Sequence, residues 1–412
     1  MMLAATPFAP IANASMNGKI DLDDFAEGGH ANDEKYWLQI RKKYFSITDD
    51  FINLENGFFG VQSNPVLKAF HKNIDLVNSQ LSKFARTDYP KLFSSIKKEV
   101  AQFLNVSDEE IIFTRNATEA LNIVIQGYPF KEGGEVLLSQ LDYSSMIETF
   151  QMLEKRGRIS IKTIDLPLWP KSEDELVEFY MKSITSKTKL VLLTQVSNVN
   201  GLIIPIKKIA DKLKPKGIDI ICDSAHALGH IPFNLKEMNA DFVGLNLHKW
   251  IGNPIGAGVL YIKKERIKEM QLFWGDAILD ETDIMKLAHY GTTQFAVMMT
   301  IPDSIAFHQL IGVEKISKRV QFLKSIWVDA LKDHPNVEVL IPGDETLSCA
   351  IASFRLKNKP VPETAAALMD QYKIFTMQRD IGNGKCIRVT PSFYNTEKEI
   401  QEFVKAVKML AV

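Results

Sequence analysis

Short strand-like runs alternate with helix-like runs between residues 110 and 262, and this alternation limits the possible folds more than any other feature. The strand-like runs are rich in Ile, Val and Leu, and apolar residues recur at helical spacing in the runs between them. Because parallel strands need long crossover connections, this order predicts an α/β fold with a mostly parallel sheet covered by helices on both faces. We expect strands at residues 110–113, 135–138, 159–164, 189–195, 218–223, 242–245 and 258–262, and helices at 118–126, 144–156 and 206–214.

The pattern of elements changes after about residue 300. We expect a long amphipathic stretch at 305–331, short strands at 337–341 and 350–356, and helices at 363–372 and 396–410. A chain of 412 residues exceeds what one hydrophobic core usually fills. The sequence therefore predicts an N-terminal arm at 1–50, a large domain at 51–300 and a smaller α+β C-terminal domain at 301–412, which part of the arm joins.

Composition argues for a small-molecule substrate. Lys and Arg number 49 against 50 Asp and Glu, so the net charge of −1 offers no basic surface for nucleic acid or an acidic membrane. No apolar run approaches the roughly 18 to 20 residues that span a bilayer. The three cysteines, Cys222, Cys349 and Cys386, are odd in number and widely spaced, which suggests neither a disulfide framework nor a metal site.

The first fifteen residues are apolar and rich in alanine. The step Ala12-Asn13-Ala14 resembles a cleavage site, but no basic segment precedes it. We therefore expect a loose N-terminal arm on a cytoplasmic protein. Export is the alternative, if residues 1–15 are the remnant of a leader.

An acid and an amine point to the chemistry of the site. Asp223 ends the predicted strand at 218–223, and the run Asn246-Leu247-His248-Lys249-Trp250 begins 23 residues later (246 − 223). A buried carboxylate is costly unless a cation faces it, and the protonated ring nitrogen of pyridoxal phosphate (PLP) is such a cation. Lys249 would carry the resting Schiff base and could afterwards move the Cα proton of a substrate. Taken singly, Asp223 could cap a turn and Lys249 could be a surface lysine.

The segment before the predicted helix at 118–126 is suited to a phosphate. It places small residues and a hydroxyl between strand and helix, so the backbone N–H groups of Ala117 and Thr118 would point at an anion. A plain helix N-cap is the alternative. The glycine-containing run at 252–258 precedes a strand, whereas a dinucleotide motif must open a helix, so we interpret it as a turn.

Six ordered motifs resemble the class V aminotransferases of PLP fold type I, most closely their isopenicillin N epimerase-like branch. The resemblance runs from about residue 53 to the C-terminus and is more specific for fold and cofactor than for reaction. The motifs are Asn116-Ala117-Thr118-Glu119-Ala120, Ser197-Asn198-Val199-Asn200-Gly201, Asp223-Ser224-Ala225-His226-Ala227, Asn246-Leu247-His248-Lys249-Trp250, Gly291-Thr292-Thr293 and Arg388-Val389-Thr390-Pro391-Ser392-Phe393-Tyr394-Asn395-Thr396.

The resemblance implies a role for each matching residue toward the cofactor. Lys249 matches the lysine of the Schiff base and Asp223 the partner of the ring nitrogen, and Tyr143 stands where a ring stacks on the cofactor. Asn198 and His226 match hydrogen-bond partners of its phenolic oxygen. The phosphate contacts would come from Ala117, Thr118, Asn246 and His248.

The resemblance also implies how substrate binds and how subunits assemble. Arg388 matches the arginine that forks onto the α-carboxylate of a substrate, and Asn56 and Gly57 lie in a loop that resembles the substrate-facing loop of the family. Thr292 matches a phosphate contact from a neighbouring subunit, which implies a homodimer with shared active sites. Without the motifs, Arg388 could instead pair with a structural carboxylate, and His226 and Tyr143 could be packed core rings. Arg115 departs from the family pattern and could add charge near the phosphate or face solvent.

The reaction type stays open at the level of sequence. Transamination, epimerisation and lyase chemistry all fit, and no residue decides among them. We expect reaction at Cα of an amino acid or another amino-bearing small molecule, by transamination or epimerisation. A C–S lyase is the alternative, and a non-catalytic PLP-fold binding protein is a further one. Persulfide-forming desulfuration is disfavoured because Cys386 lies two residues before Arg388 on one predicted strand, which cannot swing a thiol toward substrate.

Overall fold

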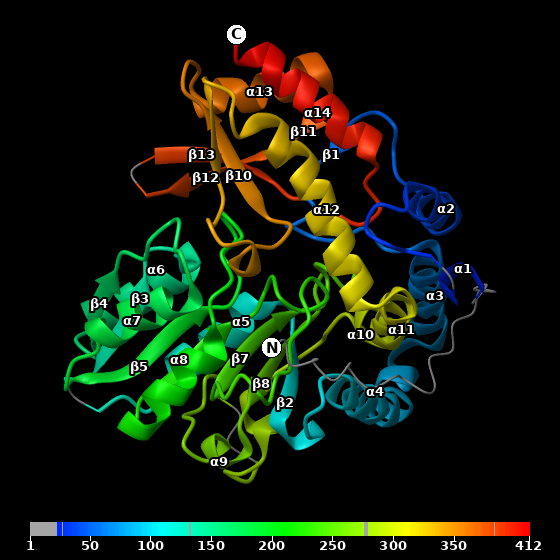
Figure 1. Ribbon diagram of the computed structural model, residues 1–412. Helices are drawn as coiled ribbons and strands as arrows, with labels where there is room; N and C mark the ends of the chain where they lie inside the picture. The colour runs from blue at the N-terminus through cyan, green and yellow to red at the C-terminus, as the bar shows by residue number, and fades with distance from the viewer. Residues whose placement is uncertain (1–22, 27, 132, 276–278, 383) are drawn as a thin grey trace.

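The computed structural model describes residues 23–26, 28–131, 133–275, 279–382 and 384–412 of the chain. The segment at 1–15, read above as an arm or a leader remnant, lies outside the described residues. Figure 1 shows two parts: a large sheet with its helices below, and the C-terminal sheet and helices above.

A seven-stranded sheet with the order β2-β8-β7-β6-β5-β3-β4 forms the centre of the larger part. The five strands β4, β3, β5, β6 and β7 run parallel, and β8 is antiparallel to both β7 and β2. The predicted α/β fold with a mostly parallel sheet is therefore confirmed. The strands are β2 (Ile111–Thr114), β3 (Glu135–Ser139), β4 (Ser160–Ile164), β5 (Thr188–Thr194), β6 (Asp219–Asp223), β7 (Phe242–Asn246) and β8 (Gly258–Ile262).

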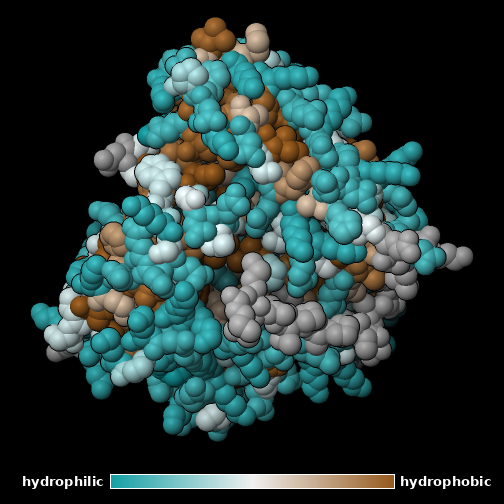
Figure 2. All heavy atoms as spheres, viewed as in Figure 1, coloured by the Kyte–Doolittle hydropathy of each residue, from teal (hydrophilic) through white to brown (hydrophobic). Residues whose placement is uncertain are grey.

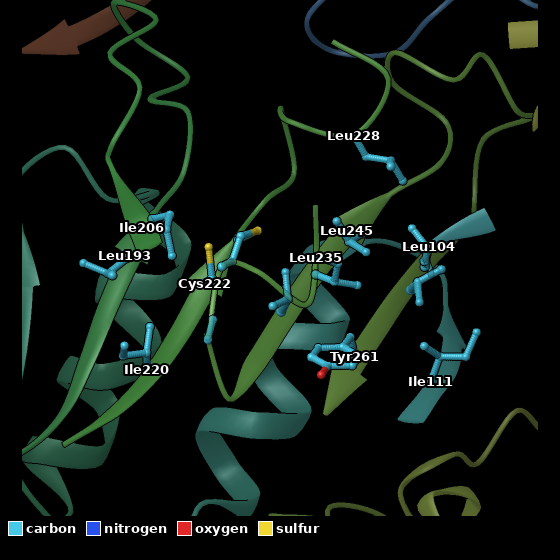
Figure 3. Packing of buried hydrophobic residues seen from close by; sticks show 14 of the residues in the cluster. Leu104, Ile111, Leu193, Ile206, Ile220, Cys222, Leu228, Leu235, Leu245 and Tyr261 are labelled. Atoms are coloured by element: carbon cyan, nitrogen blue, oxygen red, sulfur yellow. The ribbon is translucent and has the colours of Figure 1, made fainter. Parts of the chain in front are cut away.

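Helices cover both faces of this sheet because its strands are apolar on both sides. Successive side chains of a strand point to opposite faces, so Ile220 and Cys222 of β6 join one hydrophobic cluster and Ile221 joins the other. Figure 3 shows Cys222 among the side chains of the first cluster. On that face lie α4 (Tyr89–Phe103), α7 (Glu173–Ser183) and α8 (Ile206–Leu213), and on the other lie α5 (Ala117–Gly127) and α6 (Ser144–Lys155).

The C-terminal part is built on a four-stranded antiparallel sheet with the order β12-β13-β10-β9. Its strands are β9 (Val337–Leu340), β10 (Ala352–Leu356), β12 (Met377–Ile381) and β13 (Gly384–Val389). Its helices are α12 (Val313–Leu331), α13 (Val361–Tyr372) and α14 (Glu397–Leu410). Figure 2 shows hydrophilic side chains over most of the visible face, with hydrophobic ones showing through in the upper part.

The predicted amphipathic stretch at 305–331 is two helices, α11 (Ile301–Ile311) and α12, which meet at Gly312. Gly312 has φ +89°, a conformation that side chains with Cβ rarely adopt, and its N–H bonds to the carbonyl of His308 to end α11. No single described helix is long and apolar enough to cross a membrane. Phe295–Ile311 and Val313–Leu331 would pass that test only as a pair, which is bent by 70°.

The N-terminal residues are tied to the C-terminal part. The short strand β1 (Ile52–Asn53) pairs in parallel with β11 (Ile374–Phe375). Helix α2 (Glu34–Tyr44) makes ion pairs from Arg41 to Glu399 at 2.7 Å and from Glu34 to Arg319. The predicted domain boundaries stay a prediction, but residues 52–53 pair with the part expected to begin at 301, and α11 packs against helices of the larger part. The remaining elements are α1 (Asp23–Ala26), α3 (Asn64–Thr87), η1 (Asp108–Glu110), η2 (Lys214–Lys216), α9 (Lys264–Ile267), η3 (Ile284–Leu287), α10 (Phe295–Met299) and η4 (Glu345–Leu347).

Candidate active site

A cavity of about 790 Å³ opens at the carboxyl ends of the parallel strands. Thr194, Asp223 and Asn246, which end β5, β6 and β7, all line it. Residues of the β12–β13 hairpin line it as well, so the cavity lies between the two sheets. Crevices beyond the carboxyl ends of such strands are where open α/β sheets bind ligands, and this volume suits a cofactor with a small substrate.

Asp223 is a buried carboxylate that lacks a cation within hydrogen-bond reach among the described residues. Its exposed fraction is 5%, and Oδ1 accepts the N–H of Ala225 at 2.9 Å. Its other carboxylate oxygen accepts no hydrogen bond from any described residue. Burial raises the pKa of this carboxyl above its ordinary value. A protonated pyridine ring in the cavity would supply the missing partner.

Lys249 and His226 form the reactive centre of the cavity. The Nζ of Lys249 lies 3.0 Å from Nε2 of His226, and the indole N–H of Trp250 faces Nδ1 of His226 at 3.4 Å. Because an indole can only donate, this contact favours the tautomer with its proton on Nε2, which then donates to a neutral amine. Burial lowers the pKa of Lys249 to about 8, and burial also lowers the pKa of His226 well below its ordinary range. A neutral lysine is the nucleophile that an aldehyde requires.

The start of α5 forms the anion-binding side of the cavity. Asn116 caps the helix by accepting the N–H of Glu119 at 2.9 Å, and the side chain of Asn246 accepts the N–H of Ala117 at 2.9 Å. Thr118 lines the cavity, and its N–H and hydroxyl have no partner among the described residues. These two donors at a helix N-terminus suit a phosphate. The N–H of Ala117, which the sequence predicted to point at an anion, is instead bonded to Asn246, so in this arrangement Asn246 holds the turn.

His248 lines the same side of the cavity, where its ring is oriented by the backbone. Its Nδ1 lies 2.9 Å from the carbonyl oxygen of Ala257 and therefore donates to it. Nε2 then carries a proton only in the imidazolium form. Burial lowers the pKa of His248, which disfavours that form, whereas a nearby phosphate dianion would favour it. A carboxylate for a ring cation, an amine whose pKa is lowered and a helix N-terminus with unpaired donors thus face one cavity, and this set of residues fits PLP.

The other predicted site residues fall into two groups. Tyr143, which is 38% exposed, and Asn198 line the cavity, as does Gly57. Thr292 is exposed and lies outside the residues that line the cavity of its own chain. Their roles stay predictions.

The structure does not bring Asn56 into the cavity. Its side chain is buried, and its amide nitrogen donates to the carbonyl of Thr390 at 3.0 Å and to the side chain of Asn395 at 3.0 Å. Its oxygen accepts from Asn53 at 2.9 Å and from the hydroxyl of Tyr394 at 3.0 Å. With its donors and acceptor engaged, Asn56 fixes the loop, while its neighbour Gly57 lines the cavity.

Arg388 lines the cavity but is also paired within the protein. Its Nε donates to Glu55 at 3.1 Å, its Nη2 donates to the same carboxylate, and its Nη1 donates to the carbonyl of Asn198 at 2.8 Å. The pairing with a structural carboxylate that the sequence left open therefore occurs, and it leaves the outer N–H groups of Nη1 and Nη2 for a ligand. Arg115 also lines the cavity, where it pairs with Glu119 at 2.9 Å and is largely exposed.

Glu55 and Arg379 are parts of the site that were not predicted from the sequence. Arg379 lines the cavity and donates from Nη2 to Glu55 at 2.8 Å. A signal was present: in the β12–β13 hairpin Met377 pairs with Arg388 and Arg379 pairs with Cys386, so alternation puts both arginines on one face. Glu55 comes from a segment more than 300 residues away, for which the chain offers no such pattern.

No described thiol lines the cavity. All three cysteines are described and fully buried, and burial raises the pKa of each thiol, in Cys349 to about 12. Cys386 packs against Leu340 and Ile381 and faces the carbonyl of Arg379 at 3.5 Å. The described residues therefore offer no nucleophile for a persulfide-forming reaction.

Comparison with known proteins agrees with this reading of the cavity. A family model described as Aminotransferase class-V matches residues 65–403. The chain is 26% identical to isopenicillin N epimerase of Amycolatopsis lactamdurans over 91% of its own length and 98% of that protein. It is 23% identical to hercynylcysteine sulfoxide lyase of Schizosaccharomyces pombe over 89% of its length and 96% of that protein.

A solved structure shows the same fold. The apo cysteine desulfurase from Thermococcus onnurineus superposes with a TM-score of 0.80 over 90% of this chain and 97% of that one, at 22% sequence identity. These similar proteins include an epimerase, a lyase and a desulfurase, so similarity fixes the fold and leaves the reaction to be argued from the site.

Proposed function

Because the chain belongs to the class V aminotransferase family of PLP-dependent enzymes, we propose that it acts at Cα of an amino acid or another amino-bearing small molecule, by transamination or epimerisation. Its cofactor is PLP. When bound, PLP accepts the electrons released as a bond at Cα breaks. The observation that carries the proposal is the contact of the Lys249 amine with His226 in the cavity that Asp223 also lines.

The residues of the chain divide the work at Cα. Lys249 would hold the cofactor and, once freed by substrate, would accept the Cα proton, because its pKa is lowered to about 8. His226 would orient that amine through its Nε2. Asp223 would keep a proton on the ring nitrogen, and the outer N–H groups of Arg388 would hold the carboxylate of the substrate. Epimerisation would need an acid on the opposite face of Cα, whereas transamination would need only a second amino acceptor.

A C–S lyase is the second candidate. One similar protein is described as a hercynylcysteine sulfoxide lyase. A lyase releases its sulfur leaving group without a protein thiol, so it agrees with the absence of a described cysteine from the cavity lining, whereas a persulfide-forming desulfurase does not.

The first experiment tests the lysine. Protein loaded with PLP should show a visible absorbance band that is lost in Lys249→Ala. Lys249→Arg, which keeps a cation but cannot make the same link, should lose the band too. Lys207→Ala, an exposed lysine of α8 that pairs with Asp211 at 2.7 Å, should keep it. A band that persists in Lys249→Ala would contradict the proposal.

The second experiment separates the reactions. D- and L-amino acids, including cysteine conjugates, are incubated with the enzyme in D₂O, and deuterium at Cα is followed together with keto acid. Exchange without keto acid indicates epimerisation, and keto acid with exchange indicates transamination. Release of sulfide, or of pyruvate from a cysteine conjugate, indicates the lyase and excludes the first proposal.

We also propose a homodimer in which Thr292 of the partner subunit completes the phosphate site. The support is that Thr292 is exposed and lies outside its own cavity lining. Mixing Lys249→Ala with Thr292→Glu subunits should restore activity, because the site that keeps Lys249 then receives an intact threonine. A monomer by light scattering, or no recovery on mixing, would contradict this assembly.

A further inference from the structure

One carboxylate holds two cavity arginines. Oε1 of Glu55 accepts from Nη2 of Arg379 at 2.8 Å and from Nη2 of Arg388, while Oε2 accepts from Nε of Arg388 at 3.1 Å. Glu55 is 6% exposed, and the Arg388 side chain is 2% exposed. The three charges therefore act together in a region from which water is largely excluded.

The carboxylate lies on the side of the arginines away from the cavity. Arg379 and Arg388 are among the residues that line the cavity, but Glu55 is not. It therefore does not occupy the place of a substrate carboxylate, and a substrate need not displace it. The backbone of Glu55 bridges Thr390 beside the end of β13, and its N–H donates to the side chain of Asn53 at 3.2 Å, so the residue is fixed next to the guanidinium groups with which its carboxylate pairs.

This arrangement sets the charge that a substrate meets. Two guanidinium groups against one carboxylate leave one net positive charge facing the cavity. One substrate carboxylate matches that charge. A second anionic group would lose its water and find no unpaired cation at this end of the cavity. The acidic lining residue of the hairpin, Asp380, is exposed and pairs with Lys385 at 2.9 Å.

We propose that Glu55 is a specificity-determining residue: by neutralising one of the two cavity arginines from behind, it restricts this end of the site to substrates with a single carboxylate. The inference rests on the proposed function, which assigns Arg388 to the carboxylate of the substrate. It names the substrate class as amino compounds that bring a single carboxylate to this end of the site. Glu55 touches neither substrate nor cofactor, so it acts only through the charge and position of the arginines.

The test compares propionate with succinate, two unreactive probes that differ in one carboxylate. Dissociation constants are measured by calorimetry on the PLP-loaded protein. In Glu55→Gln, the affinity for succinate relative to propionate should rise about tenfold, and the rise should shrink at high salt. Glu55→Asp, which keeps the charge, should stay within about twofold of the wild-type ratio. A wild-type ratio in folded Glu55→Gln would overturn the proposal.

Glu338→Gln is the matched control. Glu338 makes the same two-pronged pair with Arg355, at 2.8 and 3.0 Å, away from the cavity lining. The ratio of succinate affinity to propionate affinity in Glu338→Gln should equal that of the wild type.

A second pair of variants tests the proposal if Glu55→Gln alone fails to fold: a single variant that removes one positive charge and a double variant that restores the net charge. Arg379→Gln leaves the cluster neutral and should weaken propionate about tenfold, and the double variant Glu55→Gln/Arg379→Gln should recover that loss. A double variant that binds no better than Arg379→Gln would overturn the proposal. Propionate binding that survives in Arg388→Gln would contradict the proposed function, whereas its loss there with an unchanged ratio in Glu55→Gln contradicts only the role of Glu55.

Discussion

The two sides of the cavity each hold a buried carboxylate, and the two differ in what faces them. Asp223, at the end of β6, has no cation within hydrogen-bond reach among the described residues, and burial raises its pKa. Glu55, behind the β12–β13 hairpin, accepts from two arginines. A buried carboxylate without a cation partner therefore indicates a ligand site, whereas a buried carboxylate paired with arginines changes the net charge of its surroundings.

The largest predicted effect is on catalysis, at Asp223. Asp223→Asn cannot hold the ring nitrogen protonated, so kcat should fall roughly 100- to 1000-fold. Steady-state kinetics with the substrate found in the isotope panel measures this. Asp380→Asn removes an exposed cavity carboxylate and should change kcat by less than about threefold. Equal losses in the two variants would contradict the role of Asp223.

The same acid-to-amide change should have opposite effects on stability at the two sites. In cofactor-free protein, Glu55→Gln leaves the buried guanidinium group of Arg388 and the partly exposed one of Arg379 short of a counter-charge, and should lower the free energy of unfolding by about 3 kcal/mol. Asp223→Asn removes an unpaired buried charge and should raise it by about 1 kcal/mol. Urea denaturation of the two variants measures both changes in the free energy of unfolding. Two changes of the same sign would contradict the proposed difference between the two sites.

A third buried acid, Asp142, should differ from Asp223 and Glu55 because it stays protonated below about pH 7. Burial raises the pKa of Asp142 to about 7, although Ser139 and Thr194 donate to it. Since the folded pKa exceeds the unfolded one, the stabilisation is fully present below about pH 4 and is lost as the pH rises to about 7. The free energy of unfolding should therefore fall by at most about 1.4 kcal/mol per pH unit in this window. Asp142→Asn should flatten that slope in urea titrations, and an unchanged slope would assign it to other groups.

The smallest effect is expected at Trp250. Trp250→Phe removes the donor to Nδ1 of His226 and with it the preference for the tautomer that faces Lys249. Because the contact is long, at 3.4 Å, kcat should fall only about threefold to tenfold. The pH profile should change as well, which loss of packing alone does not produce. A variant with the wild-type pH profile would argue against the tautomer.

The cofactor side of the cavity was predictable because it is built from strand ends. Asp223, Asn246 and the turn at Thr118 each follow an apolar run that the sequence shows, and parallel strands bring such ends to one edge. The same periodicity predicted all seven strands of the large sheet, with ends that differ by no more than one residue.

The arginine side was only partly predictable. Arg388 followed from a motif, but Glu55 reaches it through the pairing of β1 with β11, and strand pairing between distant segments leaves no local pattern. Asn56 was expected to face substrate because its loop resembles the substrate-facing loop of the family, yet its amide is used to fix that loop. The break at Gly312 was missed because apolar spacing continues across it.

The pairing of β1 with β11 also orders events during synthesis. The ribosome synthesises the strand ends and turns that line the Asp223 side of the cavity before it reaches residues 374–389. Thr118 and Lys249 are therefore present before the two arginines that pair with Glu55. Nascent chains stalled before β12 should therefore contain the cofactor-side residues but lack Arg379 and Arg388, the arginines proposed to select a substrate.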